Sequence, residues 1–74
     1  MKKIAICIPT LNEAANIVHT LSAIDEGLHE YFNQYDCTIV NCDSGSTDDT
    51  VQMFLREETK TKKISIFTRK KGKG

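Results

Sequence analysis

Three polar clusters in this chain contain the residue types that bind phosphates and nucleosides. Each follows an apolar run, and they cover residues 9–13, 43–50 and 70–74. The Asp43 carboxylate can accept a hydrogen bond from a base N–H or a ribose hydroxyl, and the Ser44 hydroxyl can donate or accept one. Gly45 lets backbone approach a ligand closely, and Lys73, between two glycines, offers a compact positive charge to a phosphate. These residue types predict binding of a nucleoside diphosphate.

The apolar runs that precede the clusters predict three β-strands. Residues 4–8 are apolar at every position, which is typical of a parallel strand covered on both faces. Pro9 is expected to end this strand, because proline lacks the N–H that a ladder requires. A second strand, rich in β-branched residues, is predicted at 37–42 and a third at 63–68.

Two helices are predicted between these strands. Apolar residues recur at helical spacing from Ala14 into the low thirties, with Asn12 as the expected N-cap. A shorter helix is expected over residues 48–56, where Ser46 and Asp49 resemble a capping box. Strands separated by helices imply right-handed crossovers and a parallel sheet, so the predicted order is β-α-β-α-β.

A parallel sheet would bring the three clusters together. Ligands bind beyond the carboxyl ends of the strands in such sheets, and all three clusters follow strand ends. The basic run at residues 69–74 ends the chain where the next helix would begin, which we interpret as a truncation. The predicted fold class is therefore α/β, one βαβαβ half of a Rossmann-like fold, with an open sheet edge through which self-association could occur.

Composition narrows the class of protein further. A chain of 74 residues can form one small domain with a marginal core. Its formal net charge of zero argues against nucleic-acid binding, since phosphate backbones select basic surfaces. Three cysteines without a CxxC pair or a zinc-type spacing favour a reduced, cytoplasmic setting. No window reaches the length of a membrane span.

The motifs resemble those of family 2-type glycosyltransferases. Residues 8–13 (Ile-Pro-Thr-Leu-Asn-Glu) are similar to the family's "iPtlNE" opening, and residues 40–50 are similar to its "vvDdgStDdT" segment. Residues 72–74 (Gly-Lys-Gly) resemble the "GKG" that precedes the family's third helix. Order and spacing match over nearly the whole chain, so the resemblance implies that residues 1–74 are the N-terminal nucleotide-sugar-binding portion of a GT-A fold.

The resemblance also implies an activity and a binding site. Such enzymes transfer a sugar from a nucleotide-diphosphate donor, here expected to be UDP- or GDP-linked, to an acceptor. In the family the counterpart of Asp43 contacts the base or ribose, and the counterpart of Lys73 lies near the diphosphate. The residues expected to bind the donor are Pro9, Thr10, Asn12, Glu13, Asp43, Ser44, Gly45 and Lys73.

Other parts of the active site are expected beyond Gly74. The resemblance implies a divalent metal, Mg or Mn, held by a DxD motif that this chain does not contain. No catalytic or metal-binding residue is expected within the chain, which alone would be inactive. The motifs are similar to the retaining branch that makes glucosyl-3-phosphoglycerate or mannosylglycerate-type products, although Ser44 stands where many members carry a second aspartate.

The same residues also suggest three other classes of protein. The second cluster also resembles the phosphate loop of actin-like ATPases, but that fold needs a hairpin where residues 48–56 have helical spacing. An EF-hand calcium loop would end in a glutamate, at the position of Phe54. A non-catalytic, flavodoxin-like interaction module is the third alternative. These residues could also have purely structural roles: Asp43 could cap or close a turn, and Asp48 and Asp49 could favour the positive end of a helix.

Overall fold

The computed structural model describes residues 1–68, which form a three-stranded sheet and two helices. The elements are β1 (Lys3–Thr10), α1 (Ile17–Tyr31), β2 (Asp36–Asp43), α2 (Thr50–Arg56) and β3 (Lys62–Phe67). β2 lies between β1 and β3, and both strand pairs are parallel. The predicted βαβαβ order and α/β class are confirmed.

The carboxyl ends of the strands lie level with one another. Thr10 at the end of β1 is in register with Asp43 at the end of β2, and Asp43 is in register with Phe67 at the end of β3. The loops that leave β1 and β2 therefore begin side by side. This register brings polar residues together that are far apart in the sequence.

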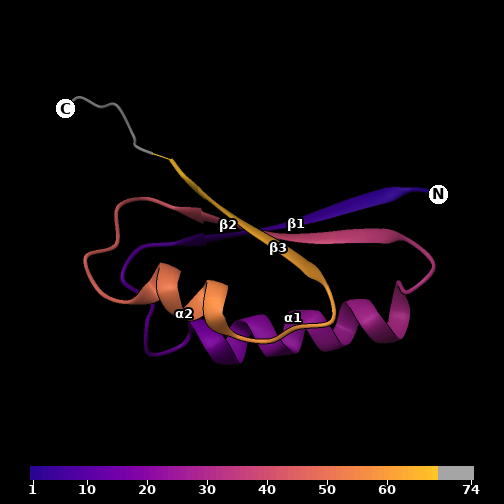
Figure 1. Ribbon diagram of the computed structural model, residues 1–74, viewed down its shortest axis with the longest axis horizontal. Coiled ribbons are helices and arrows are strands. Elements are labelled where there is room, and N and C mark those ends of the chain that lie inside the picture. The colour runs from indigo at the N-terminus through magenta and orange to yellow at the C-terminus, as the bar shows by residue number, and fades with distance from the viewer. Residues whose placement is uncertain (69–74) are drawn as a thin grey trace.

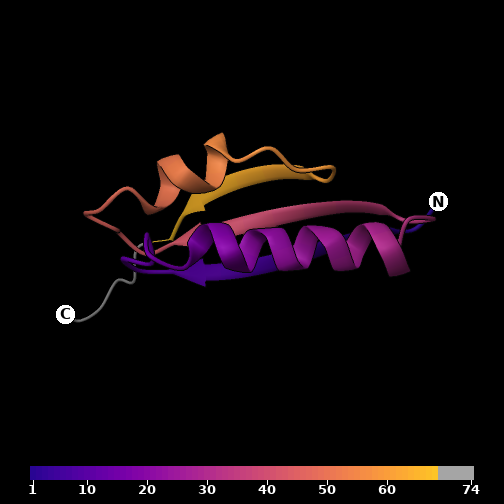
Figure 2. The ribbon, with the colours of Figure 1, turned by 90° about the horizontal axis from the view of Figure 1, so that it is seen from below.

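Both helices cover the same face of the sheet, as Figure 1 shows and Figure 2 shows again from below. Two successive crossovers of one hand between neighbouring strands produce this arrangement. The buried core lies between the helices and the sheet and consists of Ile8, Ile17, Leu21, Leu28, Ile39 and Phe54. Neither helix is long and apolar enough to cross a membrane, and these are all the helices of residues 1–68.

The opposite face of the sheet is uncovered within the described residues. Ile64 and Ile66 of β3 are 50% and 44% exposed, and Cys7 of β1 is exposed as well. These residues alternate with residues that face the helices, as the strand period of two requires. The expectation that residues 4–8 are covered on both faces is therefore wrong for this structure, because both helices lie on one side.

The first strand runs past its predicted end. β1 continues through Pro9, which is in register with Cys42, to Thr10. Among the strands of residues 1–68, β1 pairs with β2 alone, so a proline nitrogen on its unpaired side removes no ladder bond. The ends of the other two predicted strands are displaced by a single residue.

The helices do not start as the sequence predicted. α1 begins at Ile17, well beyond Asn12, so the prediction that Asn12 caps this helix is wrong. α2 begins at Thr50, and neither helix has a side-chain hydrogen bond at its N-cap. The capping box predicted for Ser46 and Asp49 is therefore also wrong.

Two charged side chains connect the helices to the segment around β3. Asp25 of α1 is buried, and its carboxylate accepts hydrogen bonds from the backbone N–H groups of Lys60 and Thr61, both at 3.0 Å, and from Thr61 Oγ1 at 2.6 Å. Lys63 of β3 donates from Nζ to backbone carbonyls at the end of α2, among them that of Phe54 at 2.8 Å. These contacts fix the path by which the chain enters β3.

Candidate functional site

Asp43 is the centre of the polar groups at the carboxyl ends of β1 and β2. Asp43 is only 4% exposed, and both oxygens of its carboxylate accept hydrogen bonds from protein donors. Oδ1 accepts from Thr10 Oγ1 at 2.7 Å and from Ser46 Oγ at 2.6 Å. Oδ2 accepts from the backbone N–H groups of Gly45 at 3.0 Å and Ser46 at 2.7 Å. The carboxylate therefore holds the turn after β2 against the end of β1.

These hydrogen bonds keep Asp43 ionised. Burial raises the pKa of the Asp43 carboxyl, but hydrogen bonds from Ser46, Thr10 and Gly45 outweigh burial and lower the pKa to about 2. A carboxylate offers about four acceptor positions, and protein donors use all of them here. The geometry thus supports the interpretation of Asp43 as a residue that closes the turn. Its contact with a base or ribose stays a prediction.

Asn12 joins the loop after β1 to the loop after β2. Its backbone is left-handed, with φ 56°, a conformation in which asparagine is enriched. Its Oδ1 accepts from the backbone N–H of Thr47 at 2.8 Å and of Asp48 at 3.3 Å, and its own N–H donates to Ser46 Oγ at 2.8 Å. Instead of capping α1, Asn12 holds two of the three predicted clusters together.

Asp48 and Thr50 form a second connection between the same loops. The backbone N–H of Glu13 donates to Thr50 Oγ1 at 2.9 Å, and that of Ala14 donates to Asp48 Oδ2 at 3.1 Å. Asp48 Oδ1 accepts from both the backbone N–H and the hydroxyl of Thr50. The Thr50 hydroxyl is the main reason that the pKa of Asp48 is lowered. This geometry supports a structural role for Asp48 at the start of α2.

The carboxylates of Asp43 and Asp48 are occupied by protein donors and not by a cation. Both oxygens of Asp43 and of Asp48 already accept hydrogen bonds from protein donors. Within residues 1–68, no group of three or more His, Cys, Asp or Glu side chains could hold a metal ion. The described residues therefore supply no ligand set for the metal that the resemblance implies.

A pocket of about 240 Å³ opens between the end of β1 and the start of α1. It is lined by Ile8, Pro9, Thr10, Glu13, Asn16, Ile17 and Thr20. Three of the residues predicted to bind the donor, Pro9, Thr10 and Glu13, thus share one pocket. Its lining mixes apolar and polar groups, as small-molecule sites do. Thr10 connects this pocket to Asp43 through its hydroxyl.

The remaining predicted residues lie beside the pocket or beyond the described structure. Asn12, Ser44 and Gly45 lie in the adjoining turns and do not line the pocket. Ser44 is exposed, and its backbone N–H donates to the Thr10 carbonyl oxygen at 3.0 Å. Gly45 has φ 110°, a conformation that glycine adopts and other residues rarely do. Lys73 lies outside the described residues.

Two residues absent from the predicted set complete the buried network. Asn41, fully buried, donates from Nδ2 to Thr10 Oγ1 at 2.8 Å and to the Ile8 carbonyl oxygen at 3.3 Å. Ser65 Oγ donates to Asn41 Oδ1 at 2.8 Å. The sequence pattern could have predicted this burial. Asn41 lies two positions from Ile39 in the same strand, so both side chains lie on the same face of the sheet. An asparagine on the core side of a strand needs buried partners.

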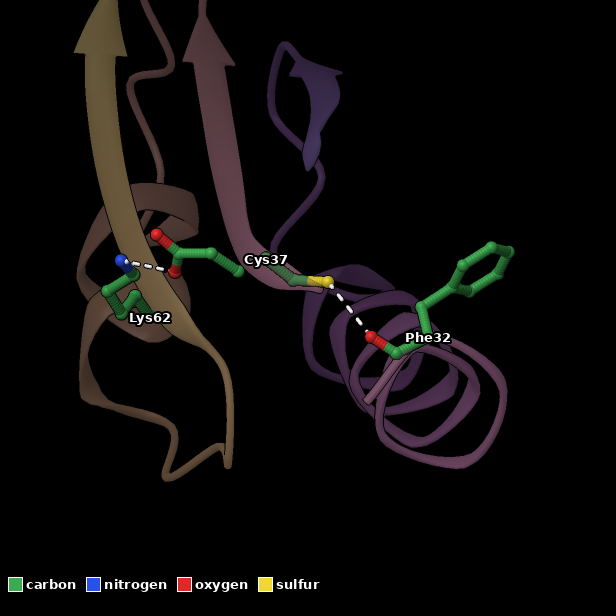
Figure 3. Close-up of polar contacts among 4 residues, drawn as sticks. Phe32, Cys37 and Lys62 are labelled. Carbon is green, nitrogen blue, oxygen red and sulfur yellow. Dashed lines mark hydrogen bonds and ion pairs between the residues drawn. The ribbon is translucent and has the colours of Figure 1, made fainter. Parts of the chain in front are cut away.

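A second pocket, of about 250 Å³, lies at the opposite end of the sheet, where β2 and β3 begin. Figure 3 shows its polar contacts. Lys62 Nζ lies 2.8 Å from Asp36 Oδ1, and the Cys37 thiol donates to the Phe32 carbonyl oxygen at 3.6 Å. The hydrogen bond and the charge of Lys62 lower the pKa of Asp36. These groups are paired with one another, and none of the described donor-binding candidates lines this pocket.

Comparison with known proteins agrees with the motifs. The family model described as "Glycosyl transferase family 2" matches residues 5–74, a range that includes both interlocked loops. No curated protein and no solved structure gives a significant match. Since the family model covers nearly the whole chain, the chain belongs to glycosyl transferase family 2.

Proposed function

We propose that this chain forms the nucleotide-sugar-binding part of a glycosyltransferase, which moves a sugar from a nucleotide-diphosphate donor to an acceptor. Family membership supports the class of enzyme. The observation that carries the site is the hydrogen bond of 2.7 Å between Thr10 Oγ1 and Asp43 Oδ1, because it joins segments 33 residues apart at one end of the sheet. Pro9 and Glu13 line the adjoining pocket.

The pocket beside β1 suits the nucleoside half of the donor. A base needs an apolar surface with a few polar partners. In this pocket Pro9 contributes an apolar surface and Glu13 a polar group. The exposed hydroxyl of Ser44 and the backbone at Gly45 are proposed to meet the ribose and the start of the diphosphate. Lys73 is proposed to meet the phosphates as a point charge.

The divalent metal is proposed to be held by residues beyond Gly74, since Asp43 and Asp48 are engaged by protein donors. When bound, such a metal stabilises the departing diphosphate as a Lewis acid. The residues of this chain are proposed to bind and orient the donor, and the catalytic groups to come from elsewhere in the enzyme. A UDP or GDP donor, the retaining branch and a cytoplasmic location remain proposals.

The fold argues against the alternatives drawn from the same motif. An actin-like phosphate loop would continue into a hairpin, whereas the turn after Asp43 leads into helix α2. A flavodoxin-like interaction module would place its first strand between its second and third, whereas here β2 lies between β1 and β3. Such a module would also bind no nucleotide sugar. Ligand titration therefore separates it from the proposed function.

A nuclear magnetic resonance titration of the protein with UDP, GDP, their sugars and ATP tests the proposal. We expect one nucleoside diphosphate to shift signals clustered at Thr10, Glu13 and Gly45. Thr20 lines the pocket and His19 does not, so Thr20→Leu should weaken this binding about tenfold or more, with His19→Leu as the matched control. Preferential binding of ATP, or equal affinities in the two variants, would contradict the assignment.

A further inference from the structure

A series of hydrogen bonds crosses the sheet beneath the candidate donor site. The Ser65 hydroxyl of β3 donates to Asn41 Oδ1, and Asn41 Nδ2 donates to Thr10 Oγ1, both at 2.8 Å. The Thr10 hydroxyl donates to Asp43 Oδ1 at 2.7 Å, and Asp43 Oδ2 accepts from the backbone N–H of Ser46 at 2.7 Å. Ser65, Asn41 and Thr10 each donate toward the turn after β2, where Asp43 accepts.

The amide of Asn41 and the acceptor-only carboxylate of Asp43 together set this direction. A hydroxyl has one proton, and Thr10 Oγ1 accepts from Asn41, so the proton of Thr10 is left for Asp43. The second Nδ2 proton of Asn41 goes to the Ile8 carbonyl oxygen, and its Oδ1 receives the Ser65 hydroxyl. Three partners therefore fix the orientation of the amide. A leucine would fill nearly the same space but would remove the donor that holds the Thr10 oxygen from the other side.

We infer that Asn41 is a positioning residue of the donor site. It keeps the Thr10 hydroxyl directed at Asp43, and so keeps the turn at residues 44–47 in the arrangement that receives the nucleotide. Asn41 is fully buried and does not line the pocket beside β1, so it acts through Thr10 and not by touching the ligand. A fully satisfied buried network rigidifies the groups it joins. This inference rests on the proposed function and adds a residue to it.

Asn41→Asp in the full protein tests the direction of the hydrogen bonds. The introduced carboxylate, when ionised, cannot donate to Thr10 and competes with Asp43 for the Thr10 proton. When protonated, it can donate to Thr10 and restores the original direction. Affinity for UDP or GDP, relative to the wild type at the same pH, should fall about tenfold near about pH 8 and recover toward about pH 5.

A loss of affinity that is the same at every pH would show an effect of packing alone and would overturn the inference, as would equal affinities throughout. If no nucleoside diphosphate binds the wild-type protein, the proposed function fails instead. The network is then tested without a ligand.

Amide hydrogen exchange provides that ligand-free test. Ser65→Ala removes one hydroxyl from the series and leaves the amide of Asn41 without its orienting donor. The backbone N–H groups of Gly45 and Ser46, both bonded to Asp43, should then exchange about three to ten times faster. Thr38→Val is the control, because the Thr38 side chain forms no hydrogen bond within residues 1–68 and lies on the other face of β2 from Asn41. Equal exchange in both variants would refute the role of Asn41.

Discussion

At the residue scale, Asp43 combines burial with a negative charge that it keeps down to low pH. Donors from Thr10, Gly45 and Ser46 replace the water that burial removes, and they lower the pKa to about 2 from an ordinary value of 3.8. Because the folded state binds this proton more weakly than the unfolded state does, the stabilisation is fully present above the ordinary pKa. It is lost as pH falls through the range between the two values.

Asp43→Asn should therefore change the pH dependence of stability. Between about pH 5 and about pH 2, the free energy of unfolding should fall by about 2 kcal/mol more in the wild type than in the variant. Urea unfolding at a series of pH values measures this difference. The other carboxylates with lowered pKa, Asp25, Asp36 and Asp48, titrate in both proteins and cancel in the comparison. Parallel profiles would show that Asp43 is not stabilised by its donors.

Replacing glycine by alanine should change the free energy of unfolding in opposite directions at Gly45 and at Gly27. Gly45→Ala places a side chain at φ 110° and should lower the free energy of unfolding by about 1 kcal/mol or more. The strain lies in the backbone, because an added Cβ would lie an ordinary 3.7 Å from the Phe67 ring. A Cβ added at Gly27 in α1 has no atom within 4 Å. Gly27→Ala should therefore raise the free energy of unfolding by about 0.5–1 kcal/mol. Thermal unfolding of both variants checks this, and the same sign in both would be inconsistent with the turn.

At the element scale, Asp25 holds the entry to β3 against α1. Asp25→Ala leaves the N–H groups of Lys60 and Thr61 without their acceptor, and should lower the free energy of unfolding by about 2 kcal/mol. Glu26→Ala, at the next and exposed position, is the control and should change it little. Denaturant unfolding of the two variants gives the comparison. Similar losses in the two variants would contradict the role of the Asp25 contact, since the gain in helix propensity on replacement by alanine cannot account for a loss.

The sequence predicted the elements better than their ends. Apolar runs and β-branched residues predicted the three strands, and helical spacing predicted the two helices, because buried residues such as Ile39 and Leu21 must lie on the covered side of their element. Asn12 was misassigned because asparagine suits both a helix N-cap and a left-handed turn. Its bond to Thr47, 35 residues away, decides between them, and no local pattern contains that information.

The order of the strands and helices predicts which loops lie together at the candidate site, but not which side chains contact one another there. A parallel sheet brings Thr10 and Asp43 to one edge whatever their side chains do, so their proximity followed from the order of elements. The contact of Asn41 with Ser65 depends on the register of β2 against β3, which the sequence does not specify. The hydrogen bonds that Asp43 accepts from Gly45 and Ser46 likewise depend on the conformation of the turn after β2.

At the scale of the whole molecule, the helices cover one face of the sheet, and residues 1–68 leave the other face open. Ile39→Ala should lower the free energy of unfolding by about 3 kcal/mol, whereas Ile66→Ala should lower it by about 1 kcal/mol or less, because Ile66 is already 44% exposed. Urea unfolding of both variants measures the difference, and equal losses would mean that the open face is covered in solution. Self-association through the open sheet edge remains a proposal that sedimentation at several concentrations would test.

The central claim is that the loops after β1 and β2 form one donor site at the carboxyl ends of the sheet. A crystal structure of the protein with a bound nucleoside diphosphate tests it most directly. We predict the nucleoside in the pocket lined by Pro9, Thr10 and Glu13, with the turn at residues 44–47 beside the ribose. A nucleotide bound at the opposite end of the sheet, near Phe32 and Lys62, or on the open face, would contradict the account.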